Sequence, residues 1–357
     1  MARAPGSPLA RELCVVYLLL IVYATLHPFT GWRDRGLSPF AWAEVWPRVV
    51  LPFDLALNAA AYLPLGLFLF WAARARLGGA GALLAAPVVG ALVSGALESL
   101  QTYLPSRIPS LADFATNALG ALVGALAGAV LFALLGGGDR ARVGAWFADT
   151  AEGARSLILA GLWLFALLYP QSILFGHGSL IAWLGPVSGY PFTPAEFSRV
   201  ESAVTAASLF AAGSLALRGL APAAPRLLVL ALFVGLAVGA RALSQAILFP
   251  PEHLWAWLTP GAQRGLAVGA VLLVLTIALP RPMRLVLVAI AATFATVTVN
   301  FAPPNPYYMA TVQDLNPGRF LNFNGLTQLV AAAWPYLVAL YLPFALAADT
   351  RAAQSAR

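Results

Sequence analysis

The chain has 357 residues, of which 61% are hydrophobic and only 10% are charged, and its mean hydropathy is +0.81. Soluble globular chains carry about 25% charged residues, so this composition excludes a protein whose whole surface faces water. The net charge is +7, but the 21 cations are all arginines scattered between apolar blocks, which argues against a nucleic-acid-binding surface. A single cysteine, Cys14, excludes an internal disulfide and a thiolate metal cluster.

Ten apolar blocks of roughly membrane-crossing length follow one another along the chain. They cover residues 12–28, 53–73, 80–103, 112–135, 156–175, 198–217, 226–249, 264–280, 283–301 and 326–347. A helix needs about 20 apolar residues to cross a bilayer, and a helix satisfies its backbone hydrogen bonds within such a segment. No small-residue cleavage site follows the first block, so we interpret it as a retained span. The sequence therefore predicts an all-α, polytopic transmembrane helical bundle of about ten spans.

The arginines are distributed unevenly between the two sides of these blocks. If the N-terminus lies in the cytoplasm, most arginines fall on cytoplasmic segments, which is the bias of the positive-inside rule. We therefore expect both termini in the cytoplasm, in a multi-pass protein of the bacterial cytoplasmic (inner) membrane. Arg241 falls late within the seventh block, and we expect its side chain to snorkel toward the outer interface.

A charged stretch separates the chain into two halves. We predict a four-span membrane domain over residues 1–137, a cytoplasmic linker over 138–154, and a C-terminal membrane domain of about six spans over 155–350. Short stretches match between the halves: Leu20–Pro28 resembles Leu162–Pro170, and Gly120–Gly124 resembles Gly265–Gly269. They indicate either a degenerate tandem repeat of four spans, as in parallel-repeat transporters, or chance similarity between segments rich in the same apolar residues.

Polar side chains in the first half gather toward the outer ends of three consecutive spans. They are Asp54, Asn58, Glu98, Gln101, Arg107, Asp113 and Asn117. Six of them form pairs that are three or four residues apart, so each pair shares one helix face. An acid within a span costs about 2.5–3.5 kcal/mol on insertion scales. We therefore predict that the seven residues form a ligand-binding polar pocket that faces the bundle.

Each acid also has a structural interpretation. Asp113 follows Ser110 by three residues, which is a helix-capping pattern, and Asp54 could cap its helix at the interface. Glu98 lies at a helix C-terminal end, where a negative charge is unfavourable, so pairing with Arg107 would compensate it.

Small residues recur every four positions in the fourth span, at Gly120, Gly124 and Gly128. This spacing predicts a face on which another helix packs closely.

These motifs resemble the VanZ-like family, which is named for a teicoplanin-resistance protein. The matching spacings are Asp54-x3-Asn58-x5-Pro64-Leu-Gly66, Glu98-x2-Gln101-x5-Arg107 and Asp113-x3-Asn117-x2-Gly120. The resemblance covers about residues 15–135, and the second half is similar to long-form members through Phe320–Thr327 and Trp334-Pro335-Tyr336. It implies a membrane protein linked to cell-envelope homeostasis or teicoplanin resistance, with a molecular activity that is poorly defined in the family.

Three functions remain open from the sequence. The first is an outer-leaflet pocket that engages a lipid-linked or lipoglycopeptide ligand. The second is an intramembrane enzyme in which Asp54, Glu98 and Asp113 act on a lipid head group as acid and base or hold a divalent cation. The third is a transporter or flippase of an amphiphile.

The sequence holds no nucleophile–base pair and no recognised catalytic signature, so we lean away from an enzyme. We accordingly predict no catalytic residue, no resident metal and no cofactor. The expected partners are the lipid bilayer and an amphiphilic ligand, and the oligomeric state is left open.

Overall fold

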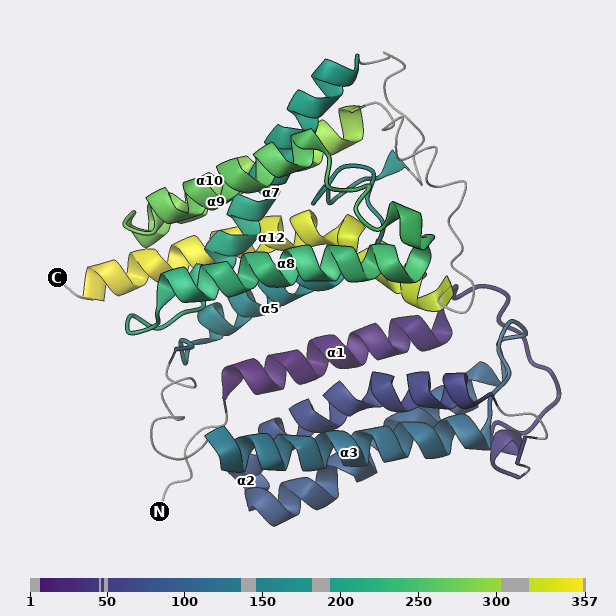
Figure 1. Ribbon diagram of the computed structural model, residues 1–357. Coiled ribbons are helices and arrows are strands. Elements are labelled where there is room, and N and C mark those ends of the chain that lie inside the picture. Colours follow the sequence, from purple (N-terminus) through teal and green to yellow (C-terminus); the bar gives the residue numbers. More distant parts are fainter. Residues whose placement is uncertain are drawn as a thin grey trace. The chain divides into compact units, whose positions relative to one another are not determined.

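The computed structural model describes residues 7–44, 46–47, 51–135, 146–181, 193–302 and 321–355. The chain divides into two compact units, Met1–Ala145 (unit 1) and Trp146–Arg357 (unit 2). The regular structure of the described residues is helical (Figure 1). In this part of the chain, seven helices are long and apolar enough to cross a membrane. The predicted class, a multi-pass helical membrane protein, is therefore confirmed, whereas the number of spans and the side on which the termini lie stay predictions.

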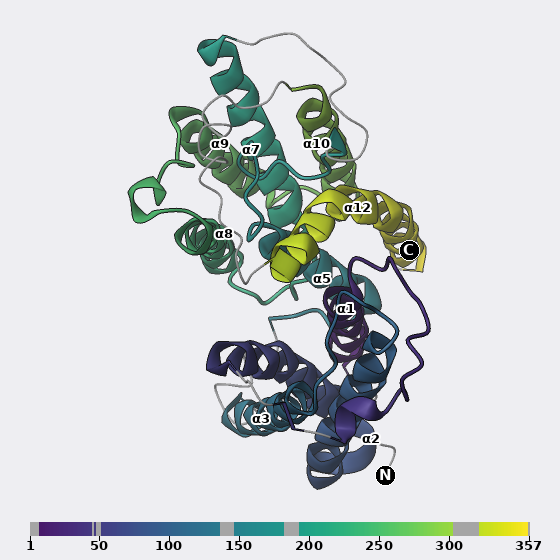
Figure 2. The same cartoon turned by 90° about the vertical axis from the view of Figure 1, so that its right-hand side faces the viewer.

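The described residues of unit 1 form three long helices and one short 3-10 turn. They are α1 (Pro8–Leu26), η1 (Ala41–Ala43), α2 (Pro52–Gln101) and α3 (Leu111–Leu135). The 50-residue α2 is broken at Gly78, whose φ of 74° and ψ of 178° lie outside the helical region. Glycine adopts such angles because it has no Cβ. The predicted blocks 53–73 and 80–103 are thus two helical segments of one element, and α2 packs against both α1 and α3 (Figures 1 and 2).

The glycine face of α3 lies directly against the backbone of α2. A Cβ atom at Gly120 would overlap the carbonyl of Ala59, and one at Gly124 would overlap the carbonyl of Leu63. On the other helix, a Cβ at Gly66 would overlap the carbonyl of Ala121. The predicted close-packing face is therefore confirmed, and it fixes the register of α2 against α3.

Unit 2 is built around one buried helix. Its elements are α5 (Ala151–Ala166), α7 (Pro194–Arg218), α8 (Arg226–Leu248), η3 (Pro251–His253), α9 (Pro260–Thr276), α10 (Arg281–Phe301) and α12 (Leu321–Ser355). In its most apolar window, 78% of the residues of α7 are buried, and α9, α10 and α5 pack around it (Figure 2). Small residues such as Ala211, Ala212 and Gly213 let these neighbours approach closely.

The predicted span 156–175 is helical only as far as Ala166. Pro170 follows, and a proline lacks the backbone N–H while disfavouring helical geometry in the residue before it. The non-helical segment after α5 is nonetheless buried, because the rings of Phe175 and His177 lie 4.7 and 5.8 Å from that of Trp163. Burial lowers the pKa of His177 to about 4, because the charged imidazolium loses its hydration there.

A charge cluster joins three helices of unit 2. Arg218 at the end of α7 makes two bonds to Asp349 on α12, Nη1–Oδ2 at 2.6 Å and Nη2–Oδ1 at 3.0 Å. The Nε of Arg218 donates to the hydroxyl of Tyr341 at 2.9 Å, and that hydroxyl lies 2.5 Å from the Oγ of Ser156 on α5. Opposite charges and hydroxyls thus satisfy one another between α5, α7 and α12.

The expectation that Arg241 snorkels outward was wrong. Its side chain is on the face of α8 that also carries Ala237, Ser244 and Gln245, and Arg241 is only 3% exposed. These residues lie three or four positions from Arg241 and therefore share with it the helix face that packs into unit 2.

Parts of the predicted organisation lie outside the described residues, namely residues 138–145 of the predicted linker and Phe320 of the C-terminal motif. The last four residues of the predicted linker, 151–154, form the first turn of α5, which begins at Ala151. The side chain of Thr150 caps this helix by accepting from the N–H of Gly153 at 3.1 Å.

Candidate functional site

Three of the predicted residues meet where α2 and α3 begin. Asp54 and Asn58 lie one turn apart on α2, and Asp113 lies in the first turn of α3. The side chain of Asn58 hydrogen-bonds the carboxyl of Asp113, and the carboxyl of Asp54 couples electrostatically to the same group. Two carboxyls and an amide from two helices therefore face one another.

The third acid, Glu98, is buried beside them. It is 3% exposed, and its Oε2 accepts a hydrogen bond from the backbone N–H of Ser110 at 2.9 Å. Its carboxyl also couples electrostatically to Asp113. Glu98 lies in the last turn of α2, but its carboxyl bonds the N–H of Ser110 at the start of α3, where the helix dipole favours a negative charge. Its unfavourable place on α2 is thus compensated by α3, and the predicted pairing with Arg107 stays a prediction.

A neutral hydrogen-bond network continues from the acids into the helix interface. Asn117 is buried, and its Nδ2 donates to the Oγ of Ser94 at 3.0 Å. Ser94 also hydrogen-bonds the buried hydroxyl of Tyr62, which couples electrostatically to Glu98. The sequence-based prediction missed Ser94 and Tyr62. Their spacing was a usable signal, since Tyr62 follows Asn58 by four residues and Ser94 precedes Glu98 by four.

Two of the predicted residues hold the end of α1 instead. The Nε2 of Gln101 donates to the carbonyl of Thr25 at 3.2 Å. The Nη2 of Arg107 donates to the carbonyls of Ala24 at 3.3 Å and His27 at 2.6 Å. The last carbonyls of a helix have no partner within the helix, and a basic side chain there is favourable. Burial lowers the pKa of Arg107, because its guanidinium loses hydration.

The seven predicted residues therefore separate into two sets with different surroundings. Asp54, Asn58, Glu98 and Asp113, with Asn117 one turn further along α3, make up what we call the acidic cluster. Gln101 and Arg107 bind backbone carbonyls of α1. Three carboxyls in one cluster repel one another when they are ionised, so a ligand that supplies cationic or hydroxyl donors would stabilise the arrangement. Within the described ranges, no group of three His, Cys, Asp or Glu residues is arranged to hold a metal ion.

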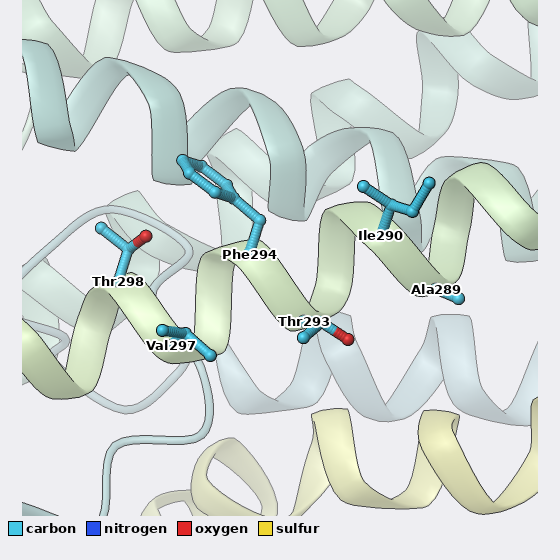
Figure 3. Close-up of a pocket in the computed structure, with 6 residues that line it drawn as sticks. All are labelled: Ala289, Ile290, Thr293, Phe294, Val297 and Thr298. Atoms are coloured by element: carbon cyan, nitrogen blue, oxygen red, sulfur yellow. The ribbon is translucent and has the colours of Figure 1, made fainter.

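Two hollows of unit 2 differ from the acidic cluster because charged side chains do not line them. The first lies along α10 and is lined by Ala289, Ile290, Thr293, Phe294, Val297 and Thr298 (Figure 3). All six side chains come from one helix, and Ile290, Phe294 and Val297 are exposed, as expected of a surface in contact with lipid. The second, near Ser244 and Asn324, has a volume of about 10 Å³, which is about the space of one water molecule. Neither hollow gathers groups that could carry out chemistry.

Comparison with known proteins identifies the family of unit 1. Residues 14–133 match the family model described as VanZ/LLP1. This range contains α2, most of α1 and α3, and all seven residues predicted from the sequence. No curated protein and no solved structure matches the chain. The resemblance seen in the sequence is confirmed for this segment, so unit 1 of this multi-pass membrane protein contains a VanZ-like region.

Proposed function

We propose that unit 1 binds the polar head of an amphiphile, a lipid-linked cell-wall intermediate or a lipoglycopeptide such as teicoplanin, and so takes part in cell-envelope homeostasis or antibiotic resistance. The observation that carries the proposal is the meeting of Asp54, Asn58 and Asp113 with the buried Glu98 beside them. Opposite charges would suffice to hold helices together, whereas three like charges would not.

The chemistry of the cluster suits a sugar or amine head group. Carboxylates accept hydrogen bonds from hydroxyl and ammonium donors, and such charge-assisted bonds are among the strongest in proteins. Asp54 is exposed and Glu98 is buried, so a head group would meet the outermost acid first. Phe53 and Leu57 flank Asp54 on α2 and are exposed, which offers an apolar surface for an acyl chain.

The proposed topology indicates on which side of the membrane the acidic cluster lies. We infer about ten spans with both termini in the cytoplasm, because this arrangement puts most of the arginines inside. The first turns of α2 and α3 then lie at the outer leaflet, where lipid-linked cell-wall intermediates and lipoglycopeptides are accessible. Cysteine introduced at Asp54 would be labelled by an impermeant reagent added outside, and labelling only from the cytoplasmic side would overturn this topology.

A binding experiment tests the proposed ligand class. Fluorescent teicoplanin should bind the detergent-solubilised full-length protein, and Asp113→Asn should weaken binding about tenfold, since losing a charge-assisted hydrogen bond costs about 1.5 kcal/mol. Asp34→Asn is the matched control, because Asp34 is an exposed acid of unit 1 whose Oδ1 accepts a hydrogen bond from the N–H of Gly36 in its own loop. A susceptible host expressing the wild type should also show reduced teicoplanin susceptibility. Equal binding by Asp113→Asn and the wild type would contradict the proposal.

A second candidate function uses the same carboxyls as catalysts. Glu98 is buried and coupled to Asp113, and two carboxyls in different surroundings suit general acid and general base roles on a lipid head group. In that case a strain lacking the gene would accumulate an unmodified lipid, and Glu98→Gln would fail to restore the modified one. Lipid extracts that do not change on deletion would remove this candidate while leaving the binding function intact.

A further inference from the structure

The end of α7 and the beginnings of α8 and α10 lie on one side of unit 2 (Figure 1), and they carry the four arginines Arg218, Arg226, Arg281 and Arg284. Arg284, in the first turn of α10, couples electrostatically to Arg226, Arg281 and Arg218, and also to Asp349. The bidentate bond between Arg218 and Asp349 offsets one of these positive charges. Arg226, Arg281 and Arg284 remain as a local excess of positive charge, which we call the arginine cluster.

Arg284 is the unusual member of this cluster. It is 8% exposed, and its Nη1 is buried with no hydrogen-bond partner among the described residues. A buried cation with an unsatisfied donor is costly unless an anion lies against it. Its electrostatic neighbours are mostly arginines, so the protein supplies repulsion there rather than compensation. An external anion beside Arg284 would offset this positive charge.

The two helices that begin at the cluster add to its attraction for anions. The N-caps of α8 and α10 are Pro225 and Pro280, neither of which makes a side-chain cap, and neither helix has an acid in its first turn. By contrast, the starts of α5, α7 and α9 are capped by Thr150, Thr193 and Thr259. Uncapped N–H groups and the positive end of a helix dipole are favourable for a bound anion.

We propose that the arginine cluster binds the phosphate of an anionic phospholipid headgroup. Arg284 would attract the phosphate through its positive charge, while Arg226 and Arg281 would hold the phosphate from the rim. Guanidinium groups match phosphate because they present two parallel N–H donors. This end of unit 2 is also the one that the arginine distribution predicts to face the cytoplasm.

The apolar surface beside the cluster favours a lipid over a free phosphate ion. Leu227 and Leu228 in the first turn of α8, and Met283 and Val286 in the first turns of α10, are exposed. Acyl chains would lie against these side chains once the headgroup reached the arginines. Basic groups at the ends of spans attract anionic lipids in this way.

Lipid titration tests the proposal on the full-length protein. Native mass spectrometry of the detergent-solubilised protein should show that phosphatidylglycerol binds in preference to phosphatidylcholine. Arg284→Gln and Arg281→Gln should each lower the affinity for phosphatidylglycerol about fivefold, the factor expected for one interfacial arginine. Arg281 is exposed, so its variant folds even if Arg284→Gln does not. Arg199→Gln is the control, because Arg199 is exposed near the opposite end of α7 and bonds the carbonyl of Ala195 on its own helix.

Two results would overturn the proposal. One is equal retention of phosphatidylglycerol by the wild type and by Arg281→Gln, which would mean that the cluster does not hold the headgroup. The other is thermal stabilisation by inorganic phosphate that equals the stabilisation by phosphatidylglycerol, which would make the ligand a free ion. Neither result bears on the acidic cluster of unit 1.

Discussion

Unit 1 and unit 2 handle their charged side chains in opposite ways. In unit 2, Arg218 meets Asp349 with two bonds and Tyr341 with a third, so charges of opposite sign satisfy one another. In unit 1, Asp54, Asp113 and Glu98 bring charges of the same sign together. The first arrangement is what a helix bundle needs to lock its helices. The second opposes folding, which points to a use other than stability.

Close packing explains how unit 1 tolerates this arrangement. Gly120 and Gly124 let α3 touch the backbone of α2, and the hydrogen bonds of Asn117, Ser94 and Tyr62 continue along the same interface. The helices are therefore held by contacts other than the carboxyls. In unit 1, helix packing holds the acids in place. In unit 2, the ion pair itself helps to hold the helices in place.

The largest effect is expected from breaking the ion pair of unit 2. Asp349→Ala would leave the mostly buried Arg218 without its carboxylate and lower the free energy of unfolding by about 3 kcal/mol. Thermal unfolding of the solubilised protein measures the change. Glu252→Ala removes an exposed acid of the same unit and serves as the control. Equal losses in the two variants would show that the pair does not lock α7 to α12.

A smaller loss is expected from separating α2 and α3. Gly124→Ala puts a Cβ into the carbonyl of Leu63, and overpacking of this kind costs about 2 kcal/mol. Gly79→Ala is matched in chemistry, but its Cβ would meet no atom within 4 Å. The unfolding temperature of Gly124→Ala should fall and its binding of teicoplanin should weaken, while Gly79→Ala stays close to the wild type. An unchanged Gly124→Ala protein would mean that the close approach of the helices is not required.

The smallest effect on stability is expected within the acidic cluster itself. Asp54→Asn keeps the shape of an exposed side chain and removes one of three like charges, so the free energy of unfolding should change by less than about 0.5 kcal/mol, or rise. The same thermal measurement checks this, and the variant should lose ligand affinity. A destabilisation as large as that of Asp349→Ala would instead assign Asp54 to the structure of α2.

Much of unit 1 could be predicted from spacing along the chain. The four-residue intervals from Asp54 to Asn58 and from Asp113 to Asn117 follow directly from the helix repeat. Asp54 and Asn58 interact with Asp113, whereas Asn117 bonds Ser94. Gln101 shows where such reasoning stops. Its interval from Glu98 puts both residues on a similar face, yet Gln101 bonds Thr25 of α1 while Glu98 bonds Ser110 at the start of α3. Which helix lies opposite each position is set by contacts far apart in the sequence.

The sequence by itself determined that this protein is helical and belongs in a membrane, because an apolar segment in lipid must satisfy its own backbone hydrogen bonds. It also determined the glycine face of α3 and the VanZ-like motif. Only the tertiary structure decided that Arg107 caps α1, that Ser94 and Tyr62 form a hydrogen-bond network next to the acidic cluster, and that Arg241 is buried. The physical reason is that the helix repeat fixes the direction of a side chain, whereas its partner depends on how the helices pack.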